Sequence, residues 1–264
     1  MARLFIFTAS QLRHKFAANV LWESHDIVGL VSEQKPDFHK KQVDEIHPLV
    51  VQHFEERERK EEFYFGIENI RFRAAEEQVR ILPYKGSNSL EVFEWVKQCH
   101  PDFIILFGSS IIRDPLLTYF KDRIINLHLG LSPYYRGSGT NFWPLVNKEP
   151  QCVGATIHYA TEEIDGGDII IQVRPDVSAT DRCHDFGCKT IIKAIEEINR
   201  LLPHLLRGEK KAVRQQKNGR VYKAKDFNVE AIAKMFENFE AGMVEDYVKN
   251  KNAFDAEFPI VTWR

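Results

Sequence analysis

The sequence predicts an α/β fold in which helices flank a mostly parallel sheet, followed by a small C-terminal extension of a β-hairpin and helices. Two observations predict the sheet. Short apolar segments such as 27–32 and 103–107 lack polar alternation, which is typical of strands buried on both faces. Segments with helical spacing of apolar residues separate these strands. The sequence pattern changes near residue 206, which predicts a larger domain over residues 1–205 and the extension over residues 206–264.

Length and composition limit the class of protein. The chain has 264 residues, 44% of them hydrophobic and 28% charged, as in ordinary soluble domains. Its formal net charge is −2, so the chain as a whole lacks the excess of basic residues that is typical of nucleic-acid-binding proteins. No apolar run approaches the ~20 residues needed to cross a bilayer. The apolar stretch Leu4 to Phe7 is too short for a signal-peptide core, so we expect a cytoplasmic protein.

The first elements form a βαβ unit. Segment 3–8 is an apolar strand, residues 10–22 have near-helical apolar spacing, and segment 27–32 is a second strand. Residues 35–62 are highly polar and include a charge run. A solvated helical insertion is favoured there over a partner-binding surface, and its role stays open.

The α/β alternation then resumes. Asn88 or Ser89 can cap a helix over 90–99. The central strand 103–107 ends in the turn Gly108-Ser109-Ser110. A short helix is expected at 115–121 and a strand at 123–127, followed by a long Gly/Pro/Ser/Tyr loop at 129–141. Loops of that length are usually functional. Two strands, 153–160 and 168–173, flank an acidic loop, and a long helix is expected at 186–206.

The tail has its own predicted structure. Asn218-Gly219 lies between the polar segments of 211–224, which is a strong hairpin pattern. A helix from Val229 to about Phe239 and a second short helix to about residue 250 follow. Because a lone hairpin is marginal in water, we expect it to pack on the larger domain or to pair across the two-fold axis of a homodimer.

The four cysteines, at 99, 152, 183 and 188, are too few for a disulfide framework and are expected to be reduced. Cys183-His184 with Cys188 is the one grouping that suggests a metal. Structural zinc usually takes four ligands in short-spaced pairs, and no second pair is present. The sequence therefore predicts no metal site.

Several chemical classes are excluded by their missing motifs. No GxxxxGK[ST] occurs and no GxGxxG follows the first strand, which argues against an ATPase and a standard dinucleotide enzyme. No HExxH is present. Ser132 lacks the second glycine of a nucleophile elbow.

Asn126, His128 and Asp165 are the candidate catalytic residues. Strand alternation puts Asn126 and His128 on one face. The amide can stabilise a developing oxyanion, and the imidazole can take a proton from an attacking amine. Asp165 precedes two glycines in a tight turn, from which its carboxylate can approach His128. A structural histidine and simple turn chemistry remain the alternatives for these residues.

Four ordered motifs give the sequence a family resemblance. They are Asn126-Leu127-His128, Ser132 to Gly137, Gly154 to His158, and Ile164 to Gly167. Together they resemble the folate-dependent formyltransferase family, strongly over 103–172 and more weakly before residue 80. The resemblance implies a Rossmann-like catalytic domain over 1–205 that binds 10-formyltetrahydrofolate.

The resemblance also implies residue roles. Asn126 would polarise the formyl oxygen, His128 would accept the amine proton, and Asp165 would orient the site. His158 would support it without a part in the chemistry. The folate contacts implied are Ser110, Ile111, Ile112, Leu117, Glu162, Glu163 and Ile164, with no metal. One departure is Gly130, which lacks a small hydroxyl that the family's loop usually has near the site.

The amine substrate is the less specific part of the resemblance. The turn Thr8 to Leu12 has no glycine, unlike glycinamide ribonucleotide formyltransferases. The tail is short and its end is not basic, unlike methionyl-tRNA formyltransferases, although 207–225 holds a basic cluster of open role. A nucleotide-linked amino sugar is therefore the expected substrate. Four loop aromatics suit stacking on a sugar or base equally well as core packing: Tyr134, Tyr135, Phe142 and Trp143. The alternatives are a methionyl-tRNA formyltransferase-like enzyme and a folate-binding protein without transferase activity.

Overall fold

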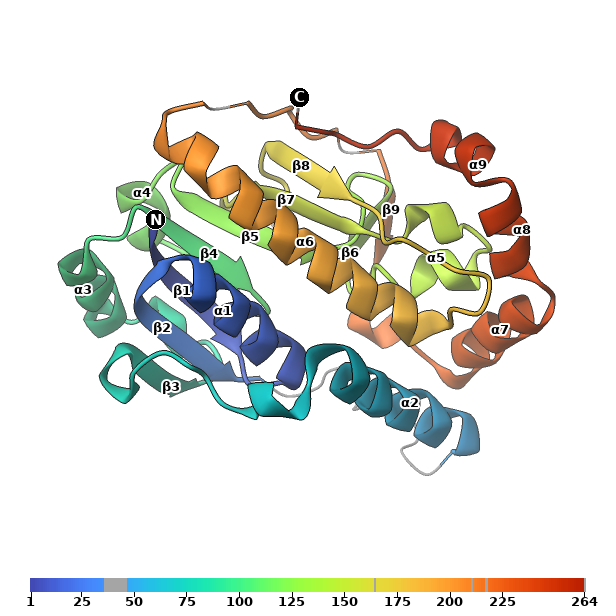
Figure 1. The fold of residues 1–264 in the computed structure, drawn as a ribbon. Coiled ribbons are helices and arrows are strands. Elements are labelled where there is room, and N and C mark those ends of the chain that lie inside the picture. The colour runs from blue at the N-terminus through green and yellow to red at the C-terminus, as the bar shows by residue number, and fades with distance from the viewer. Residues whose placement is uncertain (36–46, 164, 210, 217, 264) are drawn as a thin grey trace.

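A seven-stranded sheet forms the centre of the molecule in the computed structural model, which describes residues 1–35, 47–163, 165–209, 211–216 and 218–263 (Figure 1). The strand order is β3-β2-β1-β4-β5-β7-β8. The first five of these are mutually parallel, and β7 and β8 run antiparallel to their neighbours. The strands are β1 (Arg3–Ala9), β2 (Asp26–Gln34), β3 (Val79–Pro83), β4 (Phe103–Phe107), β5 (Ile124–Leu129), β7 (Ala155–Tyr159) and β8 (Ile169–Val173). The mostly parallel α/β architecture predicted from the sequence is confirmed.

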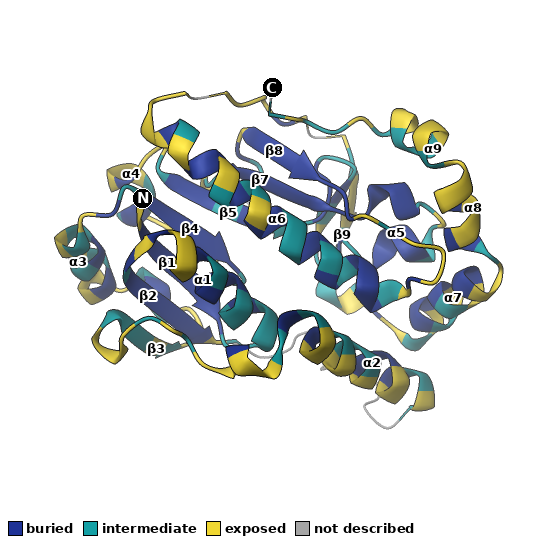
Figure 2. Cartoon of the chain, viewed as in Figure 1, coloured by how far each residue is buried: buried dark blue, intermediate teal, exposed yellow. Residues whose placement is uncertain are grey.

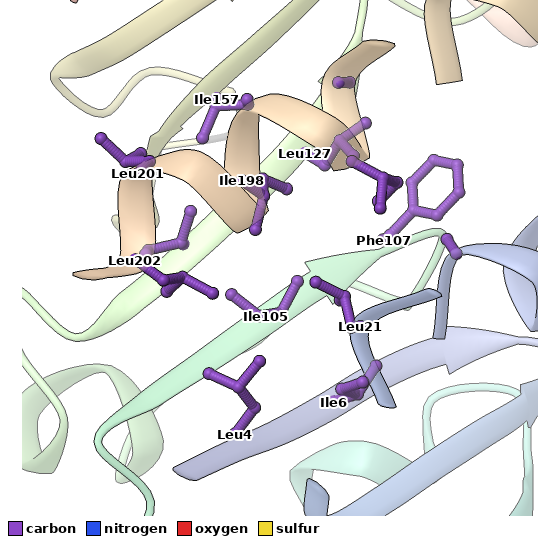
Figure 3. Packing of buried hydrophobic residues seen from close by; sticks show 14 of the residues in the cluster. Leu4, Ile6, Leu21, Ile105, Phe107, Leu127, Ile157, Ile198, Leu201 and Leu202 are labelled. Atoms are coloured by element: carbon purple, nitrogen blue, oxygen red, sulfur yellow. The ribbon is translucent and has the colours of Figure 1, made fainter. Parts of the chain in front are cut away.

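Helices cover both faces of this sheet. On one face lie α1 (Leu12–Ser24) and the long α6 (Cys183–Leu206). Ile198, Leu201 and Leu202 of α6 point at the apolar side chains of the strands (Figure 3). The other face packs against α3 (Leu90–Cys99) and α4 (Leu116–Tyr119). Both faces of the central strands are therefore buried, as Figure 2 shows, and this explains their continuous apolar sequences.

Most elements lie within a few residues of their sequence-predicted ranges. The Ser89 side chain caps α3 by accepting a hydrogen bond from the Val92 amide, as the capping pattern predicts. Strand β3 was not predicted, because it is a short, half-exposed edge strand that ends in Pro83. Short 3₁₀ turns complete the connections at Ile67–Ile70, Glu76–Gln78, Gly86–Asn88, Pro150–Cys152 and Ala224–Asp226.

The polar insertion contains α2 (Pro48–Phe65), and residues 36–46 of that insertion lie outside the described residues. The helix is solvated on one face only (Figure 2). Its other face buries Val50, His53, Phe54, Glu61 and Phe65. The expectation of a simply solvated insertion is therefore wrong for this face, because apolar residues that are sparse in the sequence gather on one side of the helix.

The hairpin predicted at Asn218-Gly219 is wrong in its pairing. Strand β9 (Arg220–Tyr222) instead pairs in parallel with β6 (Tyr135–Gly137), 85 residues away in the sequence. Val213 forms a separate antiparallel bridge with Ile169 of β8. The segments on both sides of the turn thus pair their backbone groups with the larger domain rather than with each other, since a lone hairpin is marginal in water.

A second apolar cluster joins the C-terminal extension to the rest of the chain. The extension continues through α7 (Val229–Glu240), α8 (Met243–Lys249) and α9 (Lys251–Glu257). Residues of α7 and α8 pack with α2 and with α5 (Trp143–Val146) in one buried group. Beyond α9, the carbonyl of Phe258 accepts a hydrogen bond from the buried Arg174 at the end of β8. Within the described residues, no helix is long and apolar enough to span a membrane.

Candidate active site

A cavity of about 590 Å³ opens where β4 and β5 end. Its wall includes the turn after β4, from Gly108 to Ile112, together with Asn126 and His128 of β5 and Asp165 of the loop after β7. Ligands of open parallel α/β sheets bind outside the carboxyl ends of the strands. The candidate catalytic residues therefore lie where this architecture places its ligand site.

Sheet register and a tight turn bring the predicted trio together. Asn126 and His128 lie two positions apart on β5, and β7 places His158 directly opposite Asn126. Asp165 adopts a left-handed backbone conformation with φ 49°. A Cβ at Gly167 would lie 1.7 Å from the carbonyl oxygen of Tyr159, so only glycine lets the loop fold back this closely. The fold-back brings the Asp165 carboxylate to the end of β5.

The contacts within this group are short. His128 Nδ1 lies 3.3 Å from Asp165 Oδ2. Asn126 Nδ2 donates to Asp165 Oδ1 at 3.3 Å and lies 2.9 Å from His158 Nε2. Imidazole, amide and carboxylate thus form one connected network at the cavity wall.

The protonation states follow from burial and charge. Burial lowers the pKa of His128, and the neighbouring Asp165 carboxylate only partly opposes this. Burial raises the pKa of Asp165, but the two imidazoles and the Asn126 amide lower it more, to about 2. At neutral pH His128 is therefore a neutral imidazole beside a carboxylate. Its Nδ1 proton faces Asp165, which leaves the Nε2 lone pair available as a base.

His158 orients the Asn126 side chain, and this contact specifies the supporting role that was expected for His158. Its Nδ1 lies 2.8 Å from the carbonyl oxygen of Tyr159, which can only accept, so Nδ1 bears the proton. The unprotonated Nε2 then accepts from Asn126 Nδ2. Because His158 is buried on β7, it fixes which way the Asn126 amide points.

Thr140 is a residue that sequence reasoning missed. Its hydroxyl donates to the carbonyl oxygen of Leu129 and lies 3.4 Å from His128 Nε2. A Cβ at Gly130 would lie 2.6 Å from Thr140 Oγ1 and 2.9 Å from His128 Nε2. Thr140 therefore occupies the space that a side chain at position 130 would fill and places a hydroxyl beside His128. In the sequence, the lack of a hydroxyl at Gly130 was the signal that another residue could place a hydroxyl near His128.

The residues expected to contact folate divide into three groups. Ser110, Ile111, Ile112 and Glu163 line the cavity. Leu117 does not, because it packs in the apolar cluster beside α3, and Glu162 is exposed and is likewise not part of the cavity wall. Ile164 lies outside the described residues.

A buried carboxylate supports the turn after β4. Glu33, at the end of β2, is fully buried. It accepts hydrogen bonds from the backbone and hydroxyl groups of Ser110 at 2.8 Å each, and from those of Ser87 at 3.1 and 2.6 Å. The Ser110 hydroxyl is therefore used to hold the turn in place, and the turn presents Ile111 and Ile112 to the cavity.

The cavity also has a wall that the sequence did not predict. Helix α2 contributes His53, Phe54 and Arg57, and the start of α6 contributes Cys183 and His184. Among the four loop aromatics, Phe142 alone lines this cavity. Trp143 stacks on Tyr222 at 4.3 Å between ring centroids, Tyr135 is buried, and the Tyr134 hydroxyl donates to the Pro259 carbonyl. Core packing therefore explains three of the four.

Known proteins are similar to this chain in sequence. A family model described as formyl transferase matches residues 6–196. A methionyl-tRNA formyltransferase from Clostridium acetobutylicum is 32% identical over 126 residues, 45% of this chain and 40% of its own length. A GDP-perosamine N-formyltransferase from Brucella melitensis biotype 1 is 30% identical over 125 residues, 47% of this chain and 48% of its own length. The chain thus spans half or less of these relatives.

Solved structures share the fold. An N-formyltransferase from Helicobacter canadensis, solved in complex with folinic acid and dTDP-3-aminofucose, superposes with a TM-score of 0.52. The match covers 90% of this chain and 81% of that one at 14% identity. At this identity the likeness concerns the arrangement of strands and helices.

Proposed function

Since the chain belongs to the formyl transferase family, we propose that it transfers a formyl group from 10-formyltetrahydrofolate to the amino group of a nucleotide-linked amino sugar. The observation that supports this most directly is the neutral His128, 3.3 Å from the Asp165 carboxylate and beside the Asn126 amide, at the wall of a 590 Å³ cavity. A base, an amide donor and a carboxylate suit direct acyl transfer without a covalent enzyme intermediate.

His128 acts as the general base. The amine nitrogen forms a bond to the formyl carbon, and His128 Nε2 takes the proton that the nitrogen loses. Asp165 then faces an imidazolium, and its negative charge stabilises that ion across 3.3 Å. Collapse of the tetrahedral intermediate breaks the bond between the formyl carbon and the folate nitrogen. That nitrogen takes the proton held by His128, which gives tetrahydrofolate and restores the neutral imidazole.

Asn126 stabilises the oxyanion of the tetrahedral intermediate. One Nδ2 hydrogen is held by His158, and the other makes the longer bond to Asp165. The second hydrogen turns from Asp165 to the oxyanion as the negative charge develops. His158 keeps the amide aimed during this exchange, because its own ring is fixed by the Tyr159 carbonyl.

The folate lies between the turn after β4 and the loop after β7. Ile111, Ile112 and Leu106 offer an apolar wall, and Glu163 lies on the wall contributed by the other segment. Bound there, 10-formyltetrahydrofolate supplies the formyl group. The proposed folate contacts are residues of the cavity wall, which Leu117 and Glu162 are not part of.

Two relatives and the positive charge on the cavity wall support a nucleotide-linked sugar as the substrate. The Brucella relative acts on GDP-perosamine, and the Helicobacter structure contains dTDP-3-aminofucose. Arg13, Lys35 and Arg57 on the cavity wall provide the positive charge that a diphosphate group needs. Arg13 also pairs with Glu61 at 2.5 Å, so part of its charge is already offset.

A methionyl-tRNA substrate is the second candidate. The Clostridium relative and the basic cluster at 207–225 favour it. Two arginines of that cluster are already paired, however: Arg207 with Glu209 at 2.8 Å and Arg220 with Glu149 at 2.8 Å. Pairing reduces the charge available for phosphate contacts, which supports the smaller substrate.

The deciding experiment offers both substrate classes to the enzyme. A panel of nucleotide-linked amino sugars and charged initiator tRNA is supplied with 10-formyltetrahydrofolate, and tetrahydrofolate release is measured. We expect turnover of at least one sugar and no stable tRNA complex at ~0.15 M salt, where screening acts beyond ~8 Å. Faster formylation of tRNA than of every sugar contradicts the sugar proposal. Folate binding with no transfer to any amine contradicts the enzyme proposal.

We also propose that the chain is a cytoplasmic homodimer. The proposal rests on the prevalence of two-fold symmetry among soluble oligomers, since β9 pairs within the chain and leaves no hairpin for a partner. A monomeric mass by light scattering at working concentration contradicts the dimer.

A further inference from the structure

Three metal-binding side chains meet in the cavity wall away from the catalytic trio. His53 comes from α2, and Cys183 and His184 come from the first turn of α6. These two helices pack side by side (Figure 1). One ligand atom from each residue lies within 4.8 Å of those of the other two. The proposed formyl transfer uses none of the three.

We propose that His53, Cys183 and His184 bind one divalent transition-metal ion of the zinc type, with a fourth coordination position open to the cavity. Three atoms no more than 4.8 Å apart always share a point within about 2.8 Å of each, which is 4.8 divided by the square root of three. Zinc needs ~2.0–2.1 Å to a histidine nitrogen and ~2.3 Å to a cysteine sulfur. Side-chain movements of roughly 0.5–0.8 Å therefore complete the site, well within rotamer adjustment.

Burial gives independent support for a ligand at this place. His184 is 9% exposed, and its Nε2 makes no hydrogen bond with any described residue. A buried polar atom without a hydrogen-bond partner destabilises the folded state. The ring of His53 lies 4.5 Å from that of His184 between centroids, tilted by 53°, and both residues line the cavity. A metal ion supplies the missing partner for Nε2.

The donor atoms decide which ion is bound. Two imidazole nitrogens and a thiolate are the donors that zinc prefers, whereas magnesium and calcium take oxygen ligands. The thiolate neutralises one of the two positive charges, which matters because Arg57 also lines this cavity. Three protein ligands with one free position are typical of zinc sites that bind water or a cavity ligand, rather than of closed structural sites.

The test is a Co²⁺ titration of the full chain after treatment with a chelator. We expect one Co²⁺ per chain, the visible absorption of four-coordinate cobalt, and a thiolate-to-cobalt charge-transfer band. Cys183→Ser removes the charge-transfer band, and His53→Gln or His184→Gln weakens binding roughly tenfold or more. Cys188→Ser is the matched control, because Cys188 lines the same cavity and is not one of the three clustered residues. It keeps both stoichiometry and spectrum.

A second measurement, the melting temperature, distinguishes loss of the metal site from misfolding of a variant. Zn²⁺ should raise the melting temperature of the chain and of Cys188→Ser, and Mg²⁺ should not. The inference is overturned if the chain binds no Co²⁺ or Zn²⁺, or if the charge-transfer band survives in Cys183→Ser. Neither readout depends on formyl transfer, so the proposed function and the metal site stand or fall separately.

Discussion

At the scale of single residues, the site is defined by which ring and amide nitrogens carry protons and by the groups that these protons face. Asp165 Oδ2 lies 3.3 Å from Nδ1 of His128, the Tyr159 carbonyl accepts from Nδ1 of His158, and the Asn126 amide hydrogens face His158 and Asp165. These contacts leave Nε2 of His128 as the nitrogen that can take a proton from an amine. Substitutions that keep shape but change these protons should therefore affect turnover more than folding.

Loss of the base or of the amide donor should abolish most turnover. His128→Asn should fold normally and lose ~10²–10⁴-fold in kcat, the usual contribution of general-base catalysis. Asn126→Ala should lose ~10²–10³-fold through the oxyanion. Steady-state kinetics with saturating substrates and far-ultraviolet circular dichroism measure both. Near-native rates in both variants mean that the site is wrongly assigned.

The rate should fall on the acid side of neutrality. Burial lowers the pKa of His128 below its ordinary 6.5, so the imidazole is a free base above that pH and becomes protonated only below it. We expect kcat/KM to be level near neutrality and to drop at a pH below about 6.5. Asp165 raises the pKa of His128, so Asp165→Asn should move this drop to lower pH. An unmoved profile would show that another group titrates.

The Thr140 hydroxyl should assist turnover modestly. Because it donates to Leu129, it offers a lone pair to His128 Nε2, 3.4 Å away, once that nitrogen is protonated. Thr140→Val keeps the shape and removes this acceptor. We expect about a fivefold loss in kcat, corresponding to a hydrogen bond of ~1 kcal/mol, with little change in KM. Thr140→Ser keeps the hydroxyl and should keep the rate. Equal rates in all three forms would exclude a role for the hydroxyl.

At the scale of elements, strand ends and turns determine the site. β2 contributes Glu33, which ties the turn after β4 and the 3₁₀ turn at Gly86–Asn88 into one rigid edge. β5 and β7 set Asn126 opposite His158. The cavity therefore depends also on Glu33, which is not among the residues of its wall.

Glu33 should be important for stability. Glu33→Gln places an amide group against donors from Ser87 and Ser110 and removes the charge that they solvate. We expect the free energy of unfolding to fall by ~1.5–3 kcal/mol, measured by urea denaturation. Glu23→Gln is the control, since Glu23 is half-exposed and pairs with Arg73 at the surface, where such pairs contribute little. Comparable effects from the two changes would refute the role given to Glu33.

Local patterns predicted the elements well where the element is buried or capped. The strand Phe103–Phe107 and the capped helix Leu90–Cys99 match their predicted ranges. The edge strand β3 and the β6–β9 pair were missed, because their residues have no distinctive period and their partners lie far away in the sequence. His53 and Thr140 were missed for the same reason: proximity to Cys183 and to His128 arises only in three dimensions.

At the scale of the whole molecule, the extension and the larger domain share one apolar cluster. Ile232, Met235 and Phe239 of α7 are buried together with Leu145 and Trp143 of α5. Asn238 adds hydrogen bonds to the carbonyls of Leu145 and Val146. The division at residue 205 therefore crosses a continuous core, and we expect one cooperative unfolding transition.

A cavity in that shared cluster should destabilise the chain as a whole. Ile232→Ala should lower the free energy of unfolding by ~2–5 kcal/mol, as expected for a fully buried side chain. Circular dichroism and tryptophan fluorescence should shift together. Val248→Ala, at an exposed position of α8, should change little. Loss of the α7–α9 signal at lower denaturant than the rest would show instead that the extension unfolds separately.

The parallel pairing of β6 with β9 also has a consequence during synthesis. β6 begins the segment that leads to Gly139 and Thr140, and its partner is translated 85 residues later. Nascent chains fold from the N-terminus, so the sheet can assemble while the ribosome is still adding the tail. The loop beside His128 gains its strand partner only after residue 222 has left the exit tunnel. Unfinished chains would therefore contain His128 on β5 without the loop conformation that completes its surroundings, and we expect the proposed formyl transfer to begin only after the tail has been translated.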